Sequence, residues 1–464
     1  MGNHTACQEE RRCTKVREIR IKTEPFCFIS LLSAECTKEL NGHGKLRIRG
    51  IISEDNEEKY RKMAEQEVWV TVKLEDEEGN EKVFFCGVLT DMEIWRENSL
   101  YTLAVTVHTG SFLLDLVPHI RTFQKESYIY REILEDCLEP DGGKFIALEK
   151  QGEKAGRFLV QYEETDWQFA KRLAGYARTV IIPEYTVPGP KMYFGYRDIR
   201  VNEEIAADSY RLIQRNQGNT SREYEIVSRE VYGLGDLVMF ENREWVIGKA
   251  ASSLKGQELE HVYTLLAKKD GLASVQCNGR IRGMSLKANV ADVAGTKVRI
   301  GIQGDENKDR SGYRWFDFAT VYSSPDGTGW YCMPEIGDEV RVAFPDGEEG
   351  NAYVSSCVHL EADGRTNPEE KSWKNKQGKE ILFTPGALIL RNNQGMSVEL
   401  SDEQGIRIVS DKEIALCASG NISMNSQSGG IHMSASDSMV ISQGGASISM
   451  KDAIRIGGGK IYMN

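Results

Sequence analysis

Few residues of this chain have the types and spacing that catalysis requires. The seven histidines are scattered from His4 to His432, and the chain contains no Gly-x-x-x-x-Gly-Lys-Ser/Thr, His-Glu-x-x-His or Gly-x-Ser-x-Gly motif. Carboxylates gather at Glu163–Asp166 and Asp346–Glu349. A helix N-terminus and a solvated turn explain them better than acid–base chemistry does. The sequence therefore predicts a protein that is not an enzyme, with no cofactor and no catalytic residues.

Three other groups of residues could bind a metal ion or a ligand. Cys7 and Cys13 lie in a charged leader, where a metal or disulfide role stays open, and most of the ten cysteines sit in settings typical of buried thiols. We interpret His432, the single histidine of its segment, as an outward-facing strand residue, and we predict no metal site. Six aromatic residues could stack on bases or sugar rings, but no basic groove accompanies them, so we expect them in a core or between subunits: Tyr313, Trp315, Phe316, Phe318, Trp330 and Tyr331.

The net charge excludes one class of partner. It is −12 for one chain, and three copies would carry −36 (3 × −12). Nucleic-acid backbones require clustered Lys and Arg, so we expect no nucleic-acid partner.

The most regular pattern lies in the C-terminal segment, where apolar pairs return about every eight residues between Ser, Gly and Asn. Within a pair the spacing is two, so both side chains leave one face of a short strand. Between pairs lie turn formers such as Asp402, Gly420 and Gly444. The paired residues, which we predict to form the core of a needle, are Val398, Leu400, Ile406, Ile408, Ile414, Leu416, Ile422, Met424, Ile431, Met433, Met439, Ile441, Ile448, Met450, Ile454, Ile456, Ile461 and Met463.

Two side chains per repeat cannot close a wide interior within one chain. A single-chain β-solenoid, a plain serine-rich β-meander and a prism of three intertwined chains all remain compatible with the pattern. We favour the prism, in which strands pair with neighbouring chains above and below. Nine layers about 4.8 Å apart would make a shaft of roughly 40 Å.

Length and patterning predict several domains in a mainly β protein with a small α+β insert. The chain has 464 residues, 28% of them charged and 40% hydrophobic, and no stretch approaches the roughly 18 apolar residues of a membrane span. Without a hydrophobic signal core, we expect synthesis in the cytoplasm and later assembly into a particle. The expected domains are a leader (1–16), a first β-barrel (17–110), a helical insert (111–180), a second β-barrel (181–275), a small β-domain (276–360), a linker (361–390) and the needle (391–464).

Two helices are predicted within the insert. An apolar face at Ile129, Ile133, Leu134, Cys137 and Leu138 indicates the first, which Pro140-Asp-Gly-Gly ends. In the second, Thr165 and Gln168 have the spacing of a capping box, and Phe169 and Leu173 belong to a broad buried face.

Residues 158–173 begin with Phe-Leu-Val-Gln-Tyr and lead into the predicted second helix, and residues 111–124 precede them in the chain. Both segments resemble those around the hub helix of the family of VgrG and phage late-control D proteins. Residues 329–347 resemble its OB-fold signature Pro-x-x-Gly-x-Glu-Val-x-Val-x-Phe-x-x-Gly. The matching residues are Pro334, Gly337, Glu339, Val340, Val342, Phe344 and Gly347.

The resemblance implies a homotrimeric hub and spike of a contractile injection machine, with two hub barrels, an OB-fold and a membrane-piercing, intertwined triple-stranded β-helix. Implied partners are the inner tube protein, baseplate proteins, a PAAR-type tip protein and, transiently, the target envelope. The expected platform for the tip protein comprises Gly457, Gly458, Gly459, Ile461, Tyr462, Met463 and Asn464.

Alternatives are a trimeric tail-associated receptor- or glycan-binding protein and a wall-degrading tail enzyme. The sequence leaves open whether the machine is a phage, a phage-tail-like bacteriocin, an extracellular injection system or a type VI apparatus.

Overall fold

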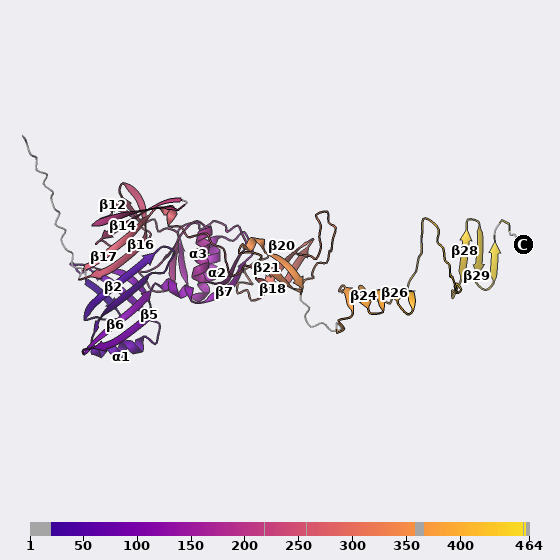
Figure 1. The fold of residues 1–464 in the computed structure, drawn as a ribbon, viewed down its shortest axis with the longest axis horizontal. Helices are drawn as coiled ribbons and strands as arrows, with labels where there is room; N and C mark the ends of the chain where they lie inside the picture. Colours follow the sequence, from indigo (N-terminus) through magenta and orange to yellow (C-terminus); the bar gives the residue numbers. More distant parts are fainter. Residues whose placement is uncertain (1–19, 218, 257, 358–365, 458, 461–464) are drawn as a thin grey trace, which may run out of the picture. The chain divides into compact units, whose positions relative to one another are not determined.

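The computed structural model describes residues 20–464 except 218, 257, 358–365, 458 and 461–464 (Figure 1). The chain divides into two compact units, residues 1–358 and 359–464. Strands dominate both, so the mainly β fold class is confirmed. The leader with Cys7 and Cys13 lies outside the described residues. Within the described part of the chain, no helix is both long enough and apolar enough to cross a bilayer.

The first unit opens with six strands that form one end of a twelve-stranded sheet, with one helix beside them (Figure 1). They are β1 (Arg20–Glu24), β2 (Ser30–Glu39), β3 (Lys45–Ile52), α1 (Glu54–Met63), β4 (Trp69–Glu75), β5 (Glu81–Glu97) and β6 (Leu100–His108). The sheet order is β1-β4-β5-β6-β3-β2, and every pair in it is antiparallel. Alternation sets the two faces: in β3, Leu46 and Ile48 are buried while Arg47 and Arg49 are exposed.

The other end of the sheet comes from a later part of the chain. Its strands, with a following 3₁₀ turn, are β12 (Arg200–Glu204), β13 (Ser209–Gln217), β14 (Asn219–Ser228), β15 (Leu237–Phe240), β16 (Arg243–Lys255), β17 (Glu258–Leu266) and η3 (Lys268–Asp270). β16 pairs antiparallel with β2, Lys249 opposite Glu39 and Ser253 opposite Glu35. The two predicted barrels therefore share one continuous sheet.

Between these halves the chain forms the helical insert. Its elements are η1 (Gly110–Asp115), β7 (Pro118–Phe123), α2 (Tyr130–Leu138), η2 (Glu139–Asp141), β8 (Lys144–Ala147), β9 (Leu159–Thr165), α3 (Asp166–Tyr176), β10 (Ile181–Pro183) and β11 (Lys191–Phe194). We expected β10 and β11 in the second barrel, and this was wrong. Both pair in a sheet with β8, and Ile181, Met192 and Phe194 are buried against the two helices. The apolar faces of α2 and α3 need this cover.

Helix α3 begins as predicted, with half of the predicted cap. Thr165 Oγ1 accepts a hydrogen bond from Gln168 N at 3.2 Å. The Thr165 hydroxyl also donates to Asp115, and hydrogen bonds from His43, Thr165 and Gln168 outweigh burial and lower the pKa of Asp115. The Gln168 side chain thus hydrogen-bonds with Asp115 on η1. The residues at the start of α3 therefore connect this helix to η1.

The small β-domain contains β18 (Ser285–Ala294), β19 (Lys297–Ile302), β20 (Phe316–Asp317), β21 (Glu339–Ala343), η4 (Glu349–Asn351) and β22 (Tyr353–Cys357). The sheet order is β20-β19-β18-β21-β22. Its core is completed from outside, because Phe158, Val160 and Tyr162 pack into it. Leu159, between them, faces the core of the insert. Alternate residues around β9 therefore serve two cores.

The second unit consists of two antiparallel meanders. One contains β23 (Lys371–Lys374), β24 (Glu380–Thr384), β25 (Ala387–Arg391), β26 (Ser397–Ser401) and β27 (Gly405–Val409), and the other contains β28 (Met439–Gln443), β29 (Ala446–Met450) and β30 (Ile454–Gly457). The linker predicted at 361–390 was wrong in its second half, which holds β23, β24 and most of β25. Within each meander every strand pairs antiparallel with the next strand along the sequence.

Candidate functional site

One face of the first meander is apolar at every position of β24–β27. The antiparallel register aligns these side chains in two columns that cross the strands. The first column begins with Trp373 on β23 and continues through Ile381, Leu390, Val398 and Ile408; the second contains Phe383, Leu388, Leu400 and Ile406. We call these nine residues the shaft face.

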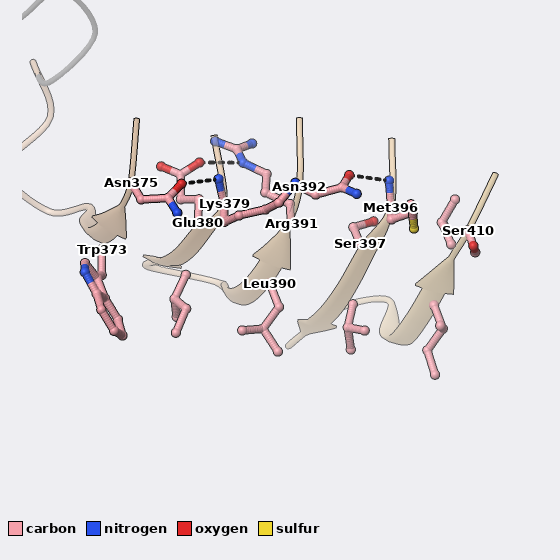
Figure 2. A pocket seen from close by; sticks show the side chains of 14 residues that line it. Trp373, Asn375, Lys379, Glu380, Leu390, Arg391, Asn392, Met396, Ser397 and Ser410 are labelled. Carbon is pink, nitrogen blue, oxygen red and sulfur yellow. Dashed lines mark hydrogen bonds and ion pairs between the residues drawn. The ribbon is translucent and has the colours of Figure 1, made fainter. Parts of the chain in front are cut away.

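The shaft face is open to solvent in the single chain. Ile406 is 73% exposed and Ile408 55%, and Trp373 lies at one end of a groove of about 540 Å³. Figure 2 shows Trp373 and Leu390 pointing to one side of the sheet, away from Glu380 and Arg391. The opposite face carries the Arg391 Nε–Glu380 Oε2 ion pair at 2.7 Å and other polar side chains, together with Leu382, which is 8% exposed and lies opposite Ile389. Large exposed apolar surfaces of this kind mark interaction sites.

The second meander repeats the arrangement on a smaller scale. Met439, Met450 and Ile454 lie opposite one another in one column, and Ile441 lies opposite Ile448 in the other. Ile441 is 55% exposed and Ile454 71%. The register also places Ile456 opposite Ile448.

The structure does not bring all of the predicted needle residues together. Residues 410–438 form no strand among those described, and six predicted core residues in this stretch are more than half exposed: Ile414, Leu416, Ile422, Met424, Ile431 and Met433. His432 is exposed there and does not lie in a strand. Nothing among the described residues covers these aliphatic side chains. Of the predicted tip platform, Gly458, Ile461, Tyr462, Met463 and Asn464 lie outside the described residues.

Five members of the shaft face were missed in the sequence: Trp373, Ile381, Phe383, Leu388 and Leu390. A signal was present, because Ile381/Phe383 and Leu388/Leu390 have the same spacing of two as the later pairs. The upstream pairs lack the serine- and glycine-rich surroundings that drew attention to the repeat.

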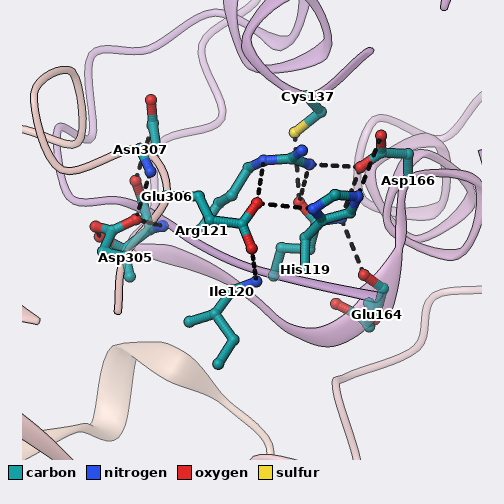
Figure 3. A network of polar contacts seen from close by, with 11 residues as sticks. His119, Ile120, Arg121, Cys137, Glu164, Asp166, Asp305, Glu306 and Asn307 are labelled. Atoms are coloured by element: carbon teal, nitrogen blue, oxygen red, sulfur yellow. Dashed lines mark hydrogen bonds and ion pairs between the residues drawn. The ribbon is translucent and has the colours of Figure 1, made fainter. Parts of the chain in front are cut away.

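A second arrangement, a polar network, joins the insert to the small β-domain within the first unit (Figure 3). Arg121 on β7 donates to Asp166 at 2.5 Å and to Gln161 at 3.1 Å, and His119 Nδ1 lies 2.7 Å from Glu306 Oε2. Burial raises the pKa of Asp166, and hydrogen bonds from Gln161 and Arg121 oppose that rise. The network is therefore a largely buried contact between the insert and the small β-domain, and most of its polar groups are hydrogen-bonded. We call this contact the seam.

The seam continues on both sides. Thr122 N donates to Asp305 Oδ1 and Asn307 Nδ2 donates to Thr122 O, each at 3.0 Å. Arg172 on α3 lies 2.7 Å from Glu164 and 2.6 Å from Glu349, and its side chain is 3% exposed. Both carboxylates share one buried guanidinium, so loss of Arg172 would leave two buried acids without their cation.

The predicted signature residues of the small β-domain serve its fold. Val340, Val342 and Phe344 are fully buried, and Pro334 is buried. Gly337 has φ +91°, which a side chain rarely adopts, and a Cβ at Gly347 would lie 2.7 Å from Cys277 Sγ. Glu339 accepts from Gln303 Nε2 at 3.3 Å. Of the predicted hub-helix residues, Phe169 and Leu173 are fully buried.

Two family models match parts of the chain. Residues 38–177 match the phage tail baseplate hub (GPD) model. Residues 287–359 match the model of the type VI secretion system/phage-baseplate injector OB domain. The chain thus contains a baseplate-hub region and an injector OB region. The first match covers β3–β6 of the sheet and the insert as far as α3, and the second covers most of the small β-domain. We refer to the whole sheet with its insert as the hub and to the small β-domain as the OB domain.

Solved structures share the fold of this chain. The half-lidded Francisella PdpA–VgrG complex contains a chain with 8% identity and a TM-score of 0.55; the match covers 85% of this chain and 88% of that chain. The chain in the lidded complex has 8% identity and a TM-score of 0.53, and the match covers 82% of this chain and 76% of that chain. The E. coli c3393 protein, a type VI secretion component, gives 13% identity and a TM-score of 0.49, covering 73% of this chain and 100% of that chain. No curated protein sequence matches significantly.

The hub contains one triad-like constellation that the sequence did not suggest. His43 Nδ1 lies 2.9 Å from Ser111 Oγ, and His43 Nε2 lies 3.3 Å from Asp115 Oδ2. Ser111 is 0% exposed and also contacts Thr109 Oγ1 at 2.9 Å. A nucleophile must reach a substrate atom, and the Ser111 hydroxyl is closed off by protein. We interpret the group as part of the packing between η1 and the loop that joins β2 to β3. Among the described residues, no group of three or more His, Cys, Asp or Glu side chains is placed to hold a metal ion.

Proposed function

We propose that the chain is the structural hub and spike of a contractile injection machine, and that three copies form the working unit. The shaft face is the observation that carries this proposal. A folded sheet that leaves two columns of Leu, Ile, Phe and Trp in water needs a cover, and identical faces from other copies provide one of matching width. Removing each half-exposed side chain from water contributes roughly 1–2 kcal/mol. The number three rests on the resemblance to trimeric hub-spike proteins.

The proposed assembly is a prism in which each chain contributes one meander as one side. Two columns of side chains per chain then point to a common axis, and the opposite face stays in solvent. The pairs between residues 410 and 438 would become strands when neighbouring chains supply partners. The predicted needle core, 391–464, is extended in this proposal to Trp373.

The hub supports a second part of the proposal, attachment to the inner tube. Each chain contributes two strand-rich halves to one continuous sheet, so three chains present six such halves. Six similar units fit a tube with six-fold symmetry. We propose that this side of the hub binds the inner tube protein and that baseplate proteins surround it.

Force would pass from hub to spike through the OB domain. The seam around Arg121 and Arg172, together with the shared strand β9, makes these domains one mechanical body. Contraction would then drive the needle, with or without a bound PAAR-type tip on residues 457–464, through the target envelope. The protein would act after assembly into a phage-tail-like particle or injection apparatus.

The decisive experiment is the mass of the purified full-length chain in solution. Light scattering and sedimentation velocity should find three times the chain mass with no dependence on dilution into the nanomolar range. A chain that stays monomeric at micromolar concentration, with the shaft face still accessible to a hydrophobic dye, would overturn the proposal. Addition to tail particles that lack this protein should restore attachment of the tube to the baseplate.

A further inference from the structure

A hairpin in the OB domain, residues 320–331, presents large apolar side chains to solvent. Val321 is 93% exposed, Tyr331 69%, and Tyr322 and Trp330 55% and 54%. The core of the domain closes without them, since Val298, Phe316 and Val342 are all buried. Of the aromatic residues that we predicted in a core or between subunits, Trp330 and Tyr331 are thus outside the core of their own chain.

The hairpin is held in place by hydrogen bonds. Trp330 N donates to Tyr322 O and Ser324 N to Thr328 O, each at 2.8 Å. Tyr331 OH reaches Gly295 O on the body of the domain at 3.1 Å. Gly329 has φ +145°, and a Cβ there would lie 2.5 Å from Tyr322 O. The apolar side chains are therefore displayed by a fixed structure.

The apolar area of the hairpin limits the kind of partner that it can bind. Four side chains that are half exposed or more offer on the order of 400–500 Å² of apolar surface. A stable complex formed from solution buries about 800 Å² on each partner. The hairpin alone is too small to capture a free protein, so it fits a partner that another interface already holds nearby.

The chain supplies such a partner if the proposed trimer forms, and the inference rests on that proposed function. β22 ends at Cys357 and β23 begins at Lys371, so thirteen residues (358–370) separate the OB domain from the shaft. That length spans at most about 45 Å. Shafts that associate must therefore keep the three OB domains close together, at effective concentrations near the millimolar range.

We propose that the hairpin of each copy packs against the OB domain of a neighbouring copy and forms a second interface of the trimer. Tyr322 and Trp330, whose backbones are hydrogen-bonded across the hairpin, act as the anchors. Aromatic anchors of this type dominate the energetics of protein interfaces.

Cys332, an exposed cysteine directly after Tyr331, reports on this contact. The probe is a bulky maleimide applied to the full-length chain, read by mass spectrometry, with exposed Cys27 as the internal reference. In the wild-type trimer Cys332 should react at least tenfold more slowly than in the double variant Leu390→Asp/Val398→Asp, which disrupts the shaft face. The variant Tyr322→Ser/Trp330→Ser should stay trimeric and restore rapid labelling. Tyr313→Ser, a 55% exposed tyrosine of the same domain, is the matched control and should keep the protection.

The possible failures are distinguishable. Equal labelling rates in the wild-type trimer and in the shaft-disrupted chain would overturn the hairpin contact and leave the trimer intact. Protection that persists in a monomeric shaft variant would also overturn it, because the cover would then come from the same chain. A wild-type chain that light scattering finds monomeric would overturn the trimer itself.

Discussion

The hub and the shaft use the same alternation of side chains and reach opposite results. In β17 of the hub, residues alternate between buried and partly exposed along the whole strand. In β27 of the shaft the same alternation leaves Ile406 and Ile408 mostly exposed. The difference is what covers the apolar face. Tyr60 of α1 and Ile182 of β10 belong to the core that packs on the hub sheet, whereas Ile406 and Ile408 of the shaft face stay exposed among the described residues. Alternation therefore shows which side chains share a face, but not which chain buries them.

The largest expected effect comes from substitutions that disrupt the shaft face. Leu390→Asp/Val398→Asp places two charges in the centre of the shaft face, where a dry interface cannot accept them. We expect complete loss of the trimer by light scattering, with the thermal unfolding of the hub unchanged. Arg407→Asp, on the opposite face of the same sheet, should remain trimeric. A stable trimer in the double variant would show that another surface holds the copies together.

The next effect concerns the buried seam between hub and OB domain. Arg172→Met leaves Glu164 and Glu349 buried without their cation, which should lower the free energy of unfolding of the first unit by about 3–5 kcal/mol. Urea denaturation followed by tryptophan fluorescence measures this. Arg131→Met removes an exposed ion pair with Glu135 within α2 and should change stability little. Equal effects in the two variants would mean that the seam contributes no more than a surface pair.

A matched truncation sharpens the comparison between a closed and an open apolar face. Leu173→Ala, fully buried in the insert, should destabilise the first unit by about 2–5 kcal/mol. Leu400→Ala, 41% exposed in the shaft, should leave the unfolding of that unit unchanged and promote dissociation on dilution. If Leu400→Ala alters hub unfolding and not dissociation, the shaft face is not an interface.

The smallest effect is a pH dependence confined to the hub. Burial, and to a lesser degree the nearby Lys38, lowers the pKa of His261 to about 4, and its Nδ1 lies 2.6 Å from Ser252 Oγ. The unfolded chain binds a proton at this histidine near pH 6.5, whereas the folded hub does not. Stability should therefore fall as pH drops from about 6.5 to 4, by up to about 3 kcal/mol. Denaturation curves across this window should be flatter for His261→Asn; an unchanged slope would assign the acid sensitivity to other groups.

Local patterns in the sequence were enough to predict some elements but not their partners. Thr165, Phe169 and Leu173 mark α3, and Val340, Val342 and Phe344 mark β21 and its buried end, because cap chemistry and alternation act within a few residues. The placement of β10 and β11 with β8 depends on contacts with residues far away in the chain, and so does the pairing of Arg172 with Glu349. No local pattern encodes such contacts. The stretch from Ile414 to Met433 shows the same limit, since its repeat specifies strands only when something is present to pair with them.

The shared strand β9 has a consequence for exchanging parts between such machines. Phe158, Val160 and Tyr162 belong to the OB core while Leu159 belongs to the core of the insert. A chimera cut at residue 276 would therefore carry an OB domain whose core lacks these three side chains. A graft that also transfers residues 118–166 would keep them, along with the β7 residues that contact Asp305 and Glu306. Recombination that swaps spikes onto foreign hubs should therefore favour breakpoints beyond Cys357, where the chain leaves the first unit with both cores complete.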